Sequence, residues 1–321
     1  MSAERFLVTG AGGQDGRYML GRLAADGAEV HAMVRTRSSA EELARRAPVA
    51  VGHVVDLTDA AATTALVAEL RPTHIVNLAG ITSVARSWAE PAETADVLGV
   101  GPVSLMEAAW DLTQSGHDVR FVQASSAEVF GDAEEVPQTE QTPLRPVSPY
   151  GAAKAFAQTM VRVFRDRGLF ASSGILYNHE SPERPESFVS RKITREVARI
   201  SRGLSDGLTL GNLDAERDWG YAPDYVDALL LIARAERPGD FIVASGESHS
   251  VREFVDAAFR HVGIEEWEPL VGVDPAFFRP AEPNRQIGDA ARLRALGWRP
   301  SLGFAELVGL MVDADLRALD G

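Results

Sequence analysis

The sequence predicts an α/β fold in which a doubly wound parallel sheet is joined to a smaller C-terminal α/β domain. Three observations lead to this prediction. Short apolar runs alternate with helical patterns through the first half, a glycine-rich turn follows the first run, and the pattern becomes irregular after about residue 178. Because such alternation connects parallel strands through right-handed crossovers, the first half is expected to be Rossmann-like.

The apolar runs of the first half are the expected strands of this sheet. Buried parallel strands are near-continuous apolar segments, and six segments match that pattern. Helices are expected between them, for example over residues 16–27 and 61–70. The expected strands cover residues 5–10, 29–35, 49–56, 74–80, 119–126 and 170–178.

The composition limits the classes of function. A formal net charge of −14 argues against nucleic acid or an anionic membrane as a primary partner. The chain has no cysteine, and its seven histidines form no ligand pair, so neither a disulfide nor a metal site is expected. No apolar run approaches the roughly 20 residues that a membrane span needs. Because an expected strand begins almost at the N-terminus, leaving no room for a signal peptide, we expect a cytoplasmic protein.

The segment VTGAGGQDG (8–16) joins the first strand to the first helix. Its glycines recur at Gly10, Gly13 and Gly16, and Asp15 occupies the place of the last glycine in the usual dinucleotide pattern. One glycine permits a tight turn, another lets the backbone approach a pyrophosphate, and a third allows close packing of helix on strand. The segment therefore indicates a dinucleotide site, with a simple tight turn as the alternative.

The end of the second strand indicates which dinucleotide is bound. An Asp or Glu usually contacts the ribose hydroxyls of NAD there, whereas this chain has Arg35, followed by Arg37 and Ser38. Guanidinium and hydroxyl groups suit a 2′-phosphate, so NADP is the expected cofactor, with a solvated loop as the alternative. Asp56, which ends the third strand, is expected either to accept from the adenine amino group or to cap the next helix.

Residues 148–164 are expected to form an amphipathic helix that begins at Ser148 and Pro149. Tyr150 and Lys154 are four residues apart and therefore lie on one face of this helix. A free tyrosine has a pKa of about 10, but a lysine ammonium and a nicotinamide cation nearby would favour the phenolate. Tyr150 could then remove a hydroxyl proton while hydride passes to the cofactor. A tyrosine and a lysine at this spacing also occur by chance. The glycine-rich turn earlier in the chain strengthens the prediction that this pair is catalytic.

Together these residues resemble the extended short-chain dehydrogenase/reductase superfamily and, within it, the GDP-mannose 4,6-dehydratase family. The second resemblance covers nearly the whole chain and implies an NADP-dependent lyase that converts GDP-mannose to a 4-keto-6-deoxy sugar nucleotide. The stretches that carry it are TGAGGQDG (9–16), GILYNHESP (174–182), FVSRKI (188–193), LGNLDAERDWGYAPDYVDA (210–228) and SGESHSVREFV (245–255).

The resemblance implies a catalytic role for the end of the fifth strand. The family has Ser-Thr-Ser-Glu there, and this chain has Ser-Ser-Ala-Glu at residues 125–128. Ser126 is implied to hold the sugar O4, and Glu128 to remove the C5 proton and help water leave from C6. Tyr150, with Lys154 beside it, is implied to take the O4 proton. An epimerase or a reductase needs no base at C5, so Glu128 separates these functions, unless it is only a surface carboxylate.

The same resemblance implies the remaining contacts and the domain division. Residues 1–178 would form the NADP-binding domain, with a returning segment near 205–235, and residues 179–321 would mainly bind the sugar nucleotide. His179 is interpreted as a packing residue. The other implied cofactor contacts are Gln14, Asp15, Leu57, Leu78 and Ala79. The implied substrate contacts are Thr82, Asn178, Val189, Lys192, Arg217, Arg279 and Glu282.

Three departures from the family pattern keep alternatives open. Ile81 and Ser83 replace a polar Gln and His beside the sugar, so another GDP-hexose or a GDP-heptose is an alternative substrate. Glu183 replaces an arginine near the diphosphate. The segment after Arg35 is shorter than the one that builds a tetramer in relatives, so a homodimer through the Tyr150 helix is expected, with a tetramer as the alternative.

Two other functions remain as hypotheses. One is an NADPH-dependent 4-keto-6-deoxy sugar nucleotide reductase, and the other is a non-catalytic nucleotide sensor.

Overall fold

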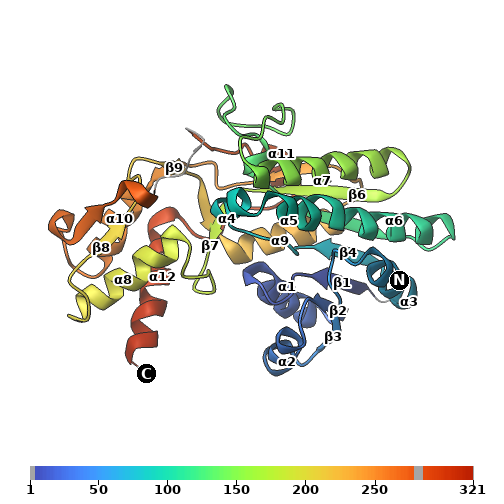
Figure 1. The fold of residues 1–321 in the computed structure, drawn as a ribbon, viewed down its shortest axis with the longest axis horizontal. Coiled ribbons are helices and arrows are strands. Elements are labelled where there is room, and N and C mark those ends of the chain that lie inside the picture. The colour runs from blue at the N-terminus through green and yellow to red at the C-terminus, as the bar shows by residue number, and fades with distance from the viewer. Residues whose placement is uncertain (1–3, 278–284, 321) are drawn as a thin grey trace.

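The computed structural model describes residues 4–277 and 285–320, and its largest element is a seven-stranded parallel sheet (Figure 1). All six neighbouring pairs of strands in this sheet are parallel. The order of strands reverses between β1 and β4, which gives the doubly wound topology predicted from the sequence. Across the sheet the strands are β11 (Asp240–Val243), β6 (Phe170–Leu176), β5 (Arg120–Ser126), β4 (His74–Asn77), β1 (Arg5–Thr9), β2 (Glu29–Val34) and β3 (Ala50–Val54).

Helices cover both faces of the sheet, because successive residues of a buried strand point to opposite sides. In β1, Phe6 and Val8 belong to one apolar cluster and Leu7 to the other. The first cluster includes residues of α1 (Gln14–Ala25), α2 (Arg37–Arg46) and α9 (Ala222–Ala233). The second includes residues of α3 (Ala60–Leu70), α6 (Gly101–Gln114) and α7 (Pro149–Asp166). Three short elements lead into α6, namely α4 (Val84–Ala89), α5 (Pro91–Ala95) and η1 (Asp96–Val100).

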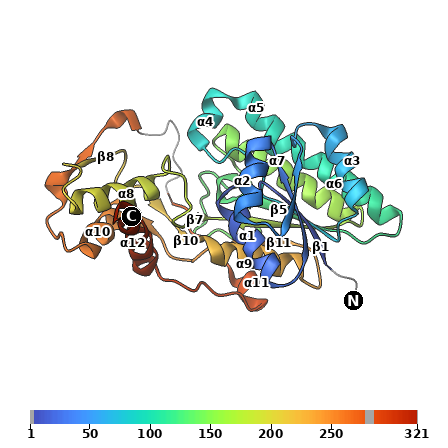
Figure 2. The same ribbon diagram turned by 90° about the horizontal axis from the view of Figure 1, so that it is seen from below.

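The remaining elements form a smaller lobe with its own apolar core. Both views show α8 (Val189–Ser201), α10 (Val251–His261) and α12 (Phe304–Asp320) gathered apart from the large sheet (Figures 1 and 2). β7 (Asn178–Glu180) pairs with β10 (Trp219–Tyr221) between the two bodies. The other paired strands are β8 (Leu208–Leu210) with β13 (Val271–Val273) and β9 (Glu216–Arg217) with β12 (His249–Ser250); α11 (Ala291–Ala295) packs on β11.

Six of the seven strands lie in segments that the sequence predicted as strands, and the seventh, β11, does not. β11 pairs with β6 and comes from residues beyond the expected returning segment. The third strand is also less buried than predicted, because it is the edge strand and pairs only with β2. Val51 and Val54 of this strand remain about half exposed, at 53% and 51%. An apolar run therefore identified a strand here but not its place in the sheet.

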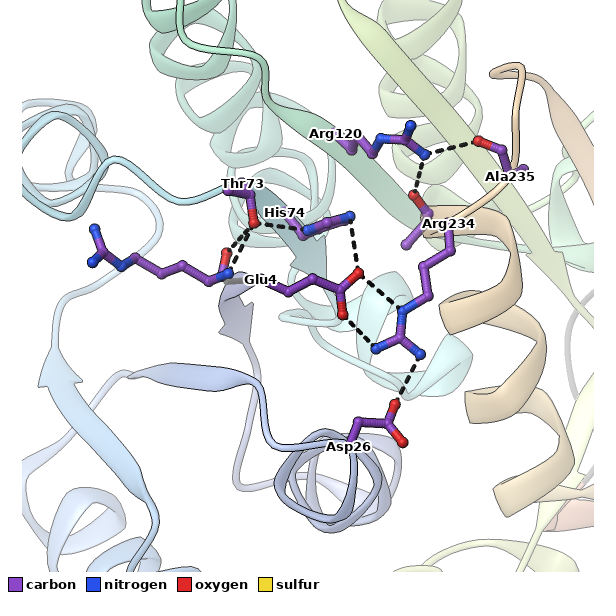
Figure 3. Close-up of polar contacts among 9 residues, drawn as sticks. Glu4, Asp26, Thr73, His74, Arg120, Arg234 and Ala235 are labelled. Atoms are coloured by element: carbon purple, nitrogen blue, oxygen red, sulfur yellow. Dashed lines mark hydrogen bonds and ion pairs between the residues drawn. The ribbon is translucent and has the colours of Figure 1, made fainter. Parts of the chain in front are cut away.

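A polar cluster joins α9 to the amino end of the sheet (Figure 3). The Glu4 carboxylate accepts from both Nε and one terminal nitrogen of Arg234, at 3.2 and 2.7 Å, and Arg234 also donates to Asp26 at 2.8 Å. Arg120 donates to the Ala233 and Ala235 carbonyls at the end of α9. These bonds satisfy carbonyls that a helix leaves unpaired, and they fix the returning helix on β1 and β5.

His74 is the buried titratable group of this cluster. Its ring stacks on Phe6 with centroids 4.4 Å apart, Nδ1 lies 2.9 Å from the Thr73 hydroxyl, and Nε2 lies 3.9 Å from the Glu4 carboxylate. Burial lowers the pKa of His74 to about 4, and the Glu4 carboxylate opposes this shift only in part. His74 is therefore neutral in the folded protein at neutral pH.

We expect His74 to make stability depend on pH between about 6.5 and about 4. The unfolded chain binds a proton at the higher value and the folded chain only at the lower one, so the free energy of unfolding falls as the pH decreases through this interval. The loss attributable to His74 amounts to about 3 kcal/mol at most. Urea unfolding of the wild type and His74→Gln at several pH values measures it. Equal pH slopes in the two proteins would contradict this assignment.

Candidate active site at the carboxyl edge of the sheet

A buried chain of hydrogen bonds forms the floor of the site. The Thr9 hydroxyl donates to Asn77 at 2.5 Å, and Asn77 donates to Gln123 at 2.8 Å, which links the carboxyl ends of β1 and β4 to the middle of β5. The Ala79 amide donates back to the Thr9 hydroxyl at 3.1 Å. Buried polar side chains must be satisfied in this way, and here the bonds fix three strands in register. This edge, at the reversal of strand order, is where doubly wound folds bind ligands.

A cavity of about 1120 Å³ extends from this floor along the ends of β1, β2 and β4. Six of the residues predicted to bind cofactor line it, whereas Gln14, Asp15, Gly16, Arg37, Ser38 and Leu78 do not. Tyr150 and Lys154 also lie outside its lining, on the β5 side of the floor. The six lining residues are Gly10, Gly13, Arg35, Asp56, Leu57 and Ala79.

The glycines of the first turn are required by close backbone contacts. Gly10 has a φ of +64°, and a Cβ there would lie 2.7 Å from the Ala79 nitrogen. A Cβ on Gly16 would lie 2.5 Å from Ala11 Cα, so this glycine allows α1 to pack on the turn. A Cβ on Gly12 would meet nothing within 4 Å, and no side chain caps the first N–H groups of α1. The backbone N–H groups of the turn and of the start of α1 are therefore accessible to an anion.

The second strand is followed by a guanidinium that faces the cavity. Arg35 lines the cavity and makes no hydrogen bond or ion pair within residues 4–277 and 285–320. Asp56, near Arg35, accepts from the Thr58 amide and hydroxyl at 3.0 and 2.8 Å, and these hydrogen bonds lower its pKa. Asp59 caps α3, so the alternative in which Asp56 caps that helix was wrong. Thr36 and Ser39 line the cavity where Arg37 and Ser38 were expected.

The α7 helix begins as the sequence predicted. The Ser148 hydroxyl accepts from the Gly151 amide at 3.1 Å, and Pro149 is the first helical residue. Lys154 is buried, and its ammonium donates to the Ala124 carbonyl of β5 at 2.8 Å. The same ammonium lies 5.9 Å from the centre of the Tyr150 ring. The helix thus brings the two predicted side chains together over the end of β5.

Ser126 and Glu128 lie beside Tyr150. Ser126 ends β5, and Glu128 follows in the short helical turn η2 (Ala127–Val129), where its amide donates to the Ser126 hydroxyl at 3.3 Å. Ser126 and Glu128 both act on the Tyr150 phenol, the first lowering and the second raising its pKa. A Cβ on Gly151 would lie 2.5 Å from the Glu128 carbonyl, so this glycine allows η2 to approach α7. Glu128 is partly buried in this turn.

Burial controls the protonation of the two groups on α7. It raises the pKa of Tyr150 to about 12, with Glu128 adding to the effect and the Ser126 hydrogen bond opposing it. It lowers the pKa of Lys154 to about 8, against the attraction of the Asp15 carboxylate. Without a ligand, the phenol is therefore protonated at neutral pH. A base of this kind needs an additional positive charge in the site before it can act.

Asp15 and His179 form a partly buried pair that was not predicted from the sequence. Nε2 of His179 lies 3.0 Å from Asp15, and Nδ1 lies 2.7 Å from the Tyr177 carbonyl, which can only accept. Both ring nitrogens therefore donate, and His179 is an imidazolium. Burial alone would lower the pKa of His179, but Asp15 outweighs it and the pKa is raised. Gln14 donates to the His179 carbonyl at 3.1 Å, so α1 is fixed to β7.

The residues predicted to bind substrate lie on several elements of the smaller lobe. Asn178 is in β7, next to His179, and Val189 is the first residue of α8. The Lys192 ammonium donates to the Thr209 carbonyl at 2.7 Å, and Arg217 is buried in β9. Thr82 is exposed after β4. Arg279 and Glu282 lie outside the described residues.

Charged residues that the sequence analysis did not assign also face this region. Arg184 pairs with the buried Glu180 at 3.0 Å and acts electrostatically on Tyr150 and Asp15. Arg17, Glu42, Arg46 and Glu183 line the cavity. Arg17 follows Gly13 by one helical turn, and this spacing was the available signal. Glu183 was already noted as a departure from the family pattern, whereas Glu42, Arg46 and Arg184 had no signal in the sequence.

The described part of the chain offers neither a metal site nor a membrane-spanning helix. No group of three or more His, Asp or Glu side chains there is arranged to hold a metal ion. No helix within the same residues is long and apolar enough to cross a membrane.

Comparisons with known proteins agree with this geometry. The GDP-mannose 4,6 dehydratase family matches residues 7–311. GDP-mannose 4,6 dehydratase 2 of Arabidopsis thaliana is 44% identical over 325 residues, covering 97% of this chain and 86% of the plant protein. The Homo sapiens GDP-mannose 4,6 dehydratase is 41% identical over 343 residues, covering 98% and 91%. The structure of UDP-glucose 4-epimerase from Thermus thermophilus in complex with NAD is 29% identical, covers 97% and 98%, and has a TM-score of 0.83.

Proposed function

Because the chain belongs to the GDP-mannose 4,6-dehydratase family, we propose that it dehydrates GDP-mannose to GDP-4-keto-6-deoxy-mannose with NADP as cofactor. The observation that carries this proposal is the position of Glu128 beside Tyr150. A phenol alone serves oxidation or reduction at C4. A carboxylate next to it adds the base that elimination across C5 and C6 requires.

Four side chains carry the proposed mechanism. NADP, when bound, would supply the hydride chemistry, which is oxidation at C4 and reduction at C6. Tyr150 accepts the O4 proton, and Ser126 donates to O4 as charge develops there. The resulting ketone acidifies C5, and Glu128 removes that proton and then protonates the leaving C6 hydroxyl, so that water departs. After hydride return, a proton is added at C5, which offsets the O4 proton that Tyr150 accepted, and the sugar has lost one water in total.

Lys154 is proposed to hold charge and position rather than to exchange protons with the sugar. Its bond to the Ala124 carbonyl fixes the ammonium beneath the phenol. Tyr150 has a pKa raised to about 12 in the ligand-free site, which is too high for a base at neutral pH. The ammonium and an oxidised nicotinamide together stabilise the phenolate and lower that pKa. Proton removal is therefore coupled to the presence of the oxidised cofactor.

The cavity fits a dinucleotide, and its charges favour NADP over NAD. Gly12 leaves open space against the backbone, and the start of α1 has no side-chain cap, as a diphosphate requires. Arg35 supplies a guanidinium that makes no hydrogen bond among the described residues, where NAD enzymes place a carboxylate. We propose that Arg35 binds the 2′-phosphate, that Asp56, Leu57 and Ala79 contact the nucleoside, and that Asn178, Lys192 and Arg217 bind the sugar nucleotide.

We expect Glu128→Gln to reduce dehydration of GDP-mannose roughly 10²–10⁴-fold, because it removes the general base. Tyr150→Phe should abolish turnover, because it removes the group that accepts the O4 proton in the first step. Mass and NMR analysis of the product, with NADPH absorbance recorded in parallel, measures both. The wild type should give loss of one water without accumulation of NADPH, and Glu134→Gln, on the exposed loop after β5, is the matched control. Near-normal turnover by Glu128→Gln would instead support a reductase.

We expect Arg35→Gln to weaken NADP binding about tenfold or more and to leave NAD binding unchanged, because it removes a charge-assisted bond to one phosphate. Arg37→Gln is the control, since Arg37 lies outside the cavity lining. Titration calorimetry with both dinucleotides measures the effect. Equal losses for NAD and NADP would show that Arg35 does not read the 2′-phosphate.

We propose that the chain forms a homodimer through α7 and the helix beside it. Phe156, Val163 and Val100 leave apolar surface on this side of the molecule, with exposures of 47%, 41% and 56%. Phe156→Glu should convert a dimer to a monomer in light scattering, because a charge would be buried at the contact. Leu204→Glu, at an equally exposed site on the smaller lobe, should leave the mass unchanged. A wild-type monomer would refute the dimer.

A further inference from the structure

Four charged side chains from three separate segments form a cluster at one side of the cofactor cavity. Arg17 comes from α1, Glu42 and Arg46 from α2, and Glu183 from the loop between β7 and α8. Glu42 accepts a hydrogen bond from Arg17 at 3.2 Å and forms an ion pair with Arg46 at 3.2 Å. Glu183 pairs with Arg17 and lies 3.6 Å from Arg46. All four residues line the cavity, so the cluster forms part of its wall.

Arg17 is the centre of this cluster, and each edge of its guanidinium is in use. Its Nε donates to the Gly12 carbonyl at 3.1 Å, one terminal nitrogen contacts Glu42, and the other contacts Glu183. Three of the five N–H donors of this guanidinium are therefore engaged by protein acceptors in three segments. Arg17 thus holds protein segments together at the wall of the cavity.

The segment that Arg17 holds is residues 181–188, which connect β7 to α8. The Ser181 hydroxyl donates to Gln14 at 2.8 Å, and the Glu183 amide donates to that hydroxyl at 3.1 Å. These bonds attach the beginning of the segment to α1. The Glu183 carboxylate adds an ionic attachment to the turn at Gly12 and to α2. The smaller lobe is thus bound to the glycine-rich turn along the side of the cavity.

We propose that Arg17 is a positioning residue which, through Glu183, anchors the 181–188 segment to the glycine-rich turn and slows release of the dinucleotide. The inference rests on the proposed function, in which this cavity holds NADP. That reaction returns hydride to the sugar and restores the oxidised cofactor in every turnover. Release of the cofactor is then never required, and an anchored wall keeps the enzyme loaded.

Stopped-flow displacement of bound NADPH, followed by its fluorescence, tests this proposal without measuring turnover. Arg17→Gln and Glu183→Gln should each release NADPH about threefold to tenfold faster, as expected for a partly exposed ion-pair network. Raising the salt concentration should accelerate release from the wild type more than from either variant. Glu186→Gln is the matched control, since Glu186 lies in the same segment but pairs with Arg195 outside the cavity lining.

A double-mutant cycle separates an anchor from general loosening of the fold. If Arg17 acts through Glu183, the double variant should release NADPH no faster than Arg17→Gln alone, whereas independent effects would multiply. Unchanged release from Glu183→Gln would overturn the proposal. Slower release would also overturn it, because Glu183 would then compete with the phosphates. Failure of the wild type to bind any dinucleotide would instead refute the proposed function.

Discussion

Parallel strands all end at one edge of a sheet, and this constraint determines where the chemistry of this protein is located. The glycine-rich turn follows β1, the Arg35 guanidinium follows β2, and the Ser126–Glu128 turn follows β5. Segments more than 100 residues apart in the sequence therefore meet without any long loop. The bonds from Thr9 through Asn77 to Gln123 hold three strands in register, so the groups above them keep fixed separations.

Close backbone approach then brings the candidate catalytic groups into contact. The turn that carries Glu128 lies against the first turn of α7 because Gly151 has no side chain to separate them. Tyr150 is adjacent to that glycine, and Ser126 opposes the rise of its pKa. Burial raises the pKa of Tyr150 and lowers the pKa of Lys154. The phenol therefore stays protonated and cannot act as a base until a cation enters the site. This coupling suits a reaction in which proton and hydride leave the same part of the sugar.

Ionic and hydrogen-bonding contacts connect the two lobes at several places. At the carboxyl edge, the Asp15–His179 pair joins α1 to β7, and Arg17 with Glu183 joins the glycine-rich turn to the following segment. Within the large lobe, at the amino edge, Arg234 joins the end of α9 to Glu4. The smaller lobe is thus fixed at the carboxyl edge of the large sheet, and the returning helix at the amino edge. The cavity lies between segments held in this way.

The sequence alone predicted the doubly wound parallel class of the large sheet, the start of α7 at Ser148, and the family. Those properties follow from local signals, because apolar periodicity, helix caps and contiguous motifs are readable in one segment. It could not determine that β3 is an exposed edge, that β11 adds a seventh strand, or that Asp59 rather than Asp56 caps α3. Neither the ionised state of His179 nor the cluster around Arg17 could be predicted from the sequence. Each of these features depends on residues that are distant in the chain. Folding brings those side chains together, and their burial in the folded protein sets their pKa values.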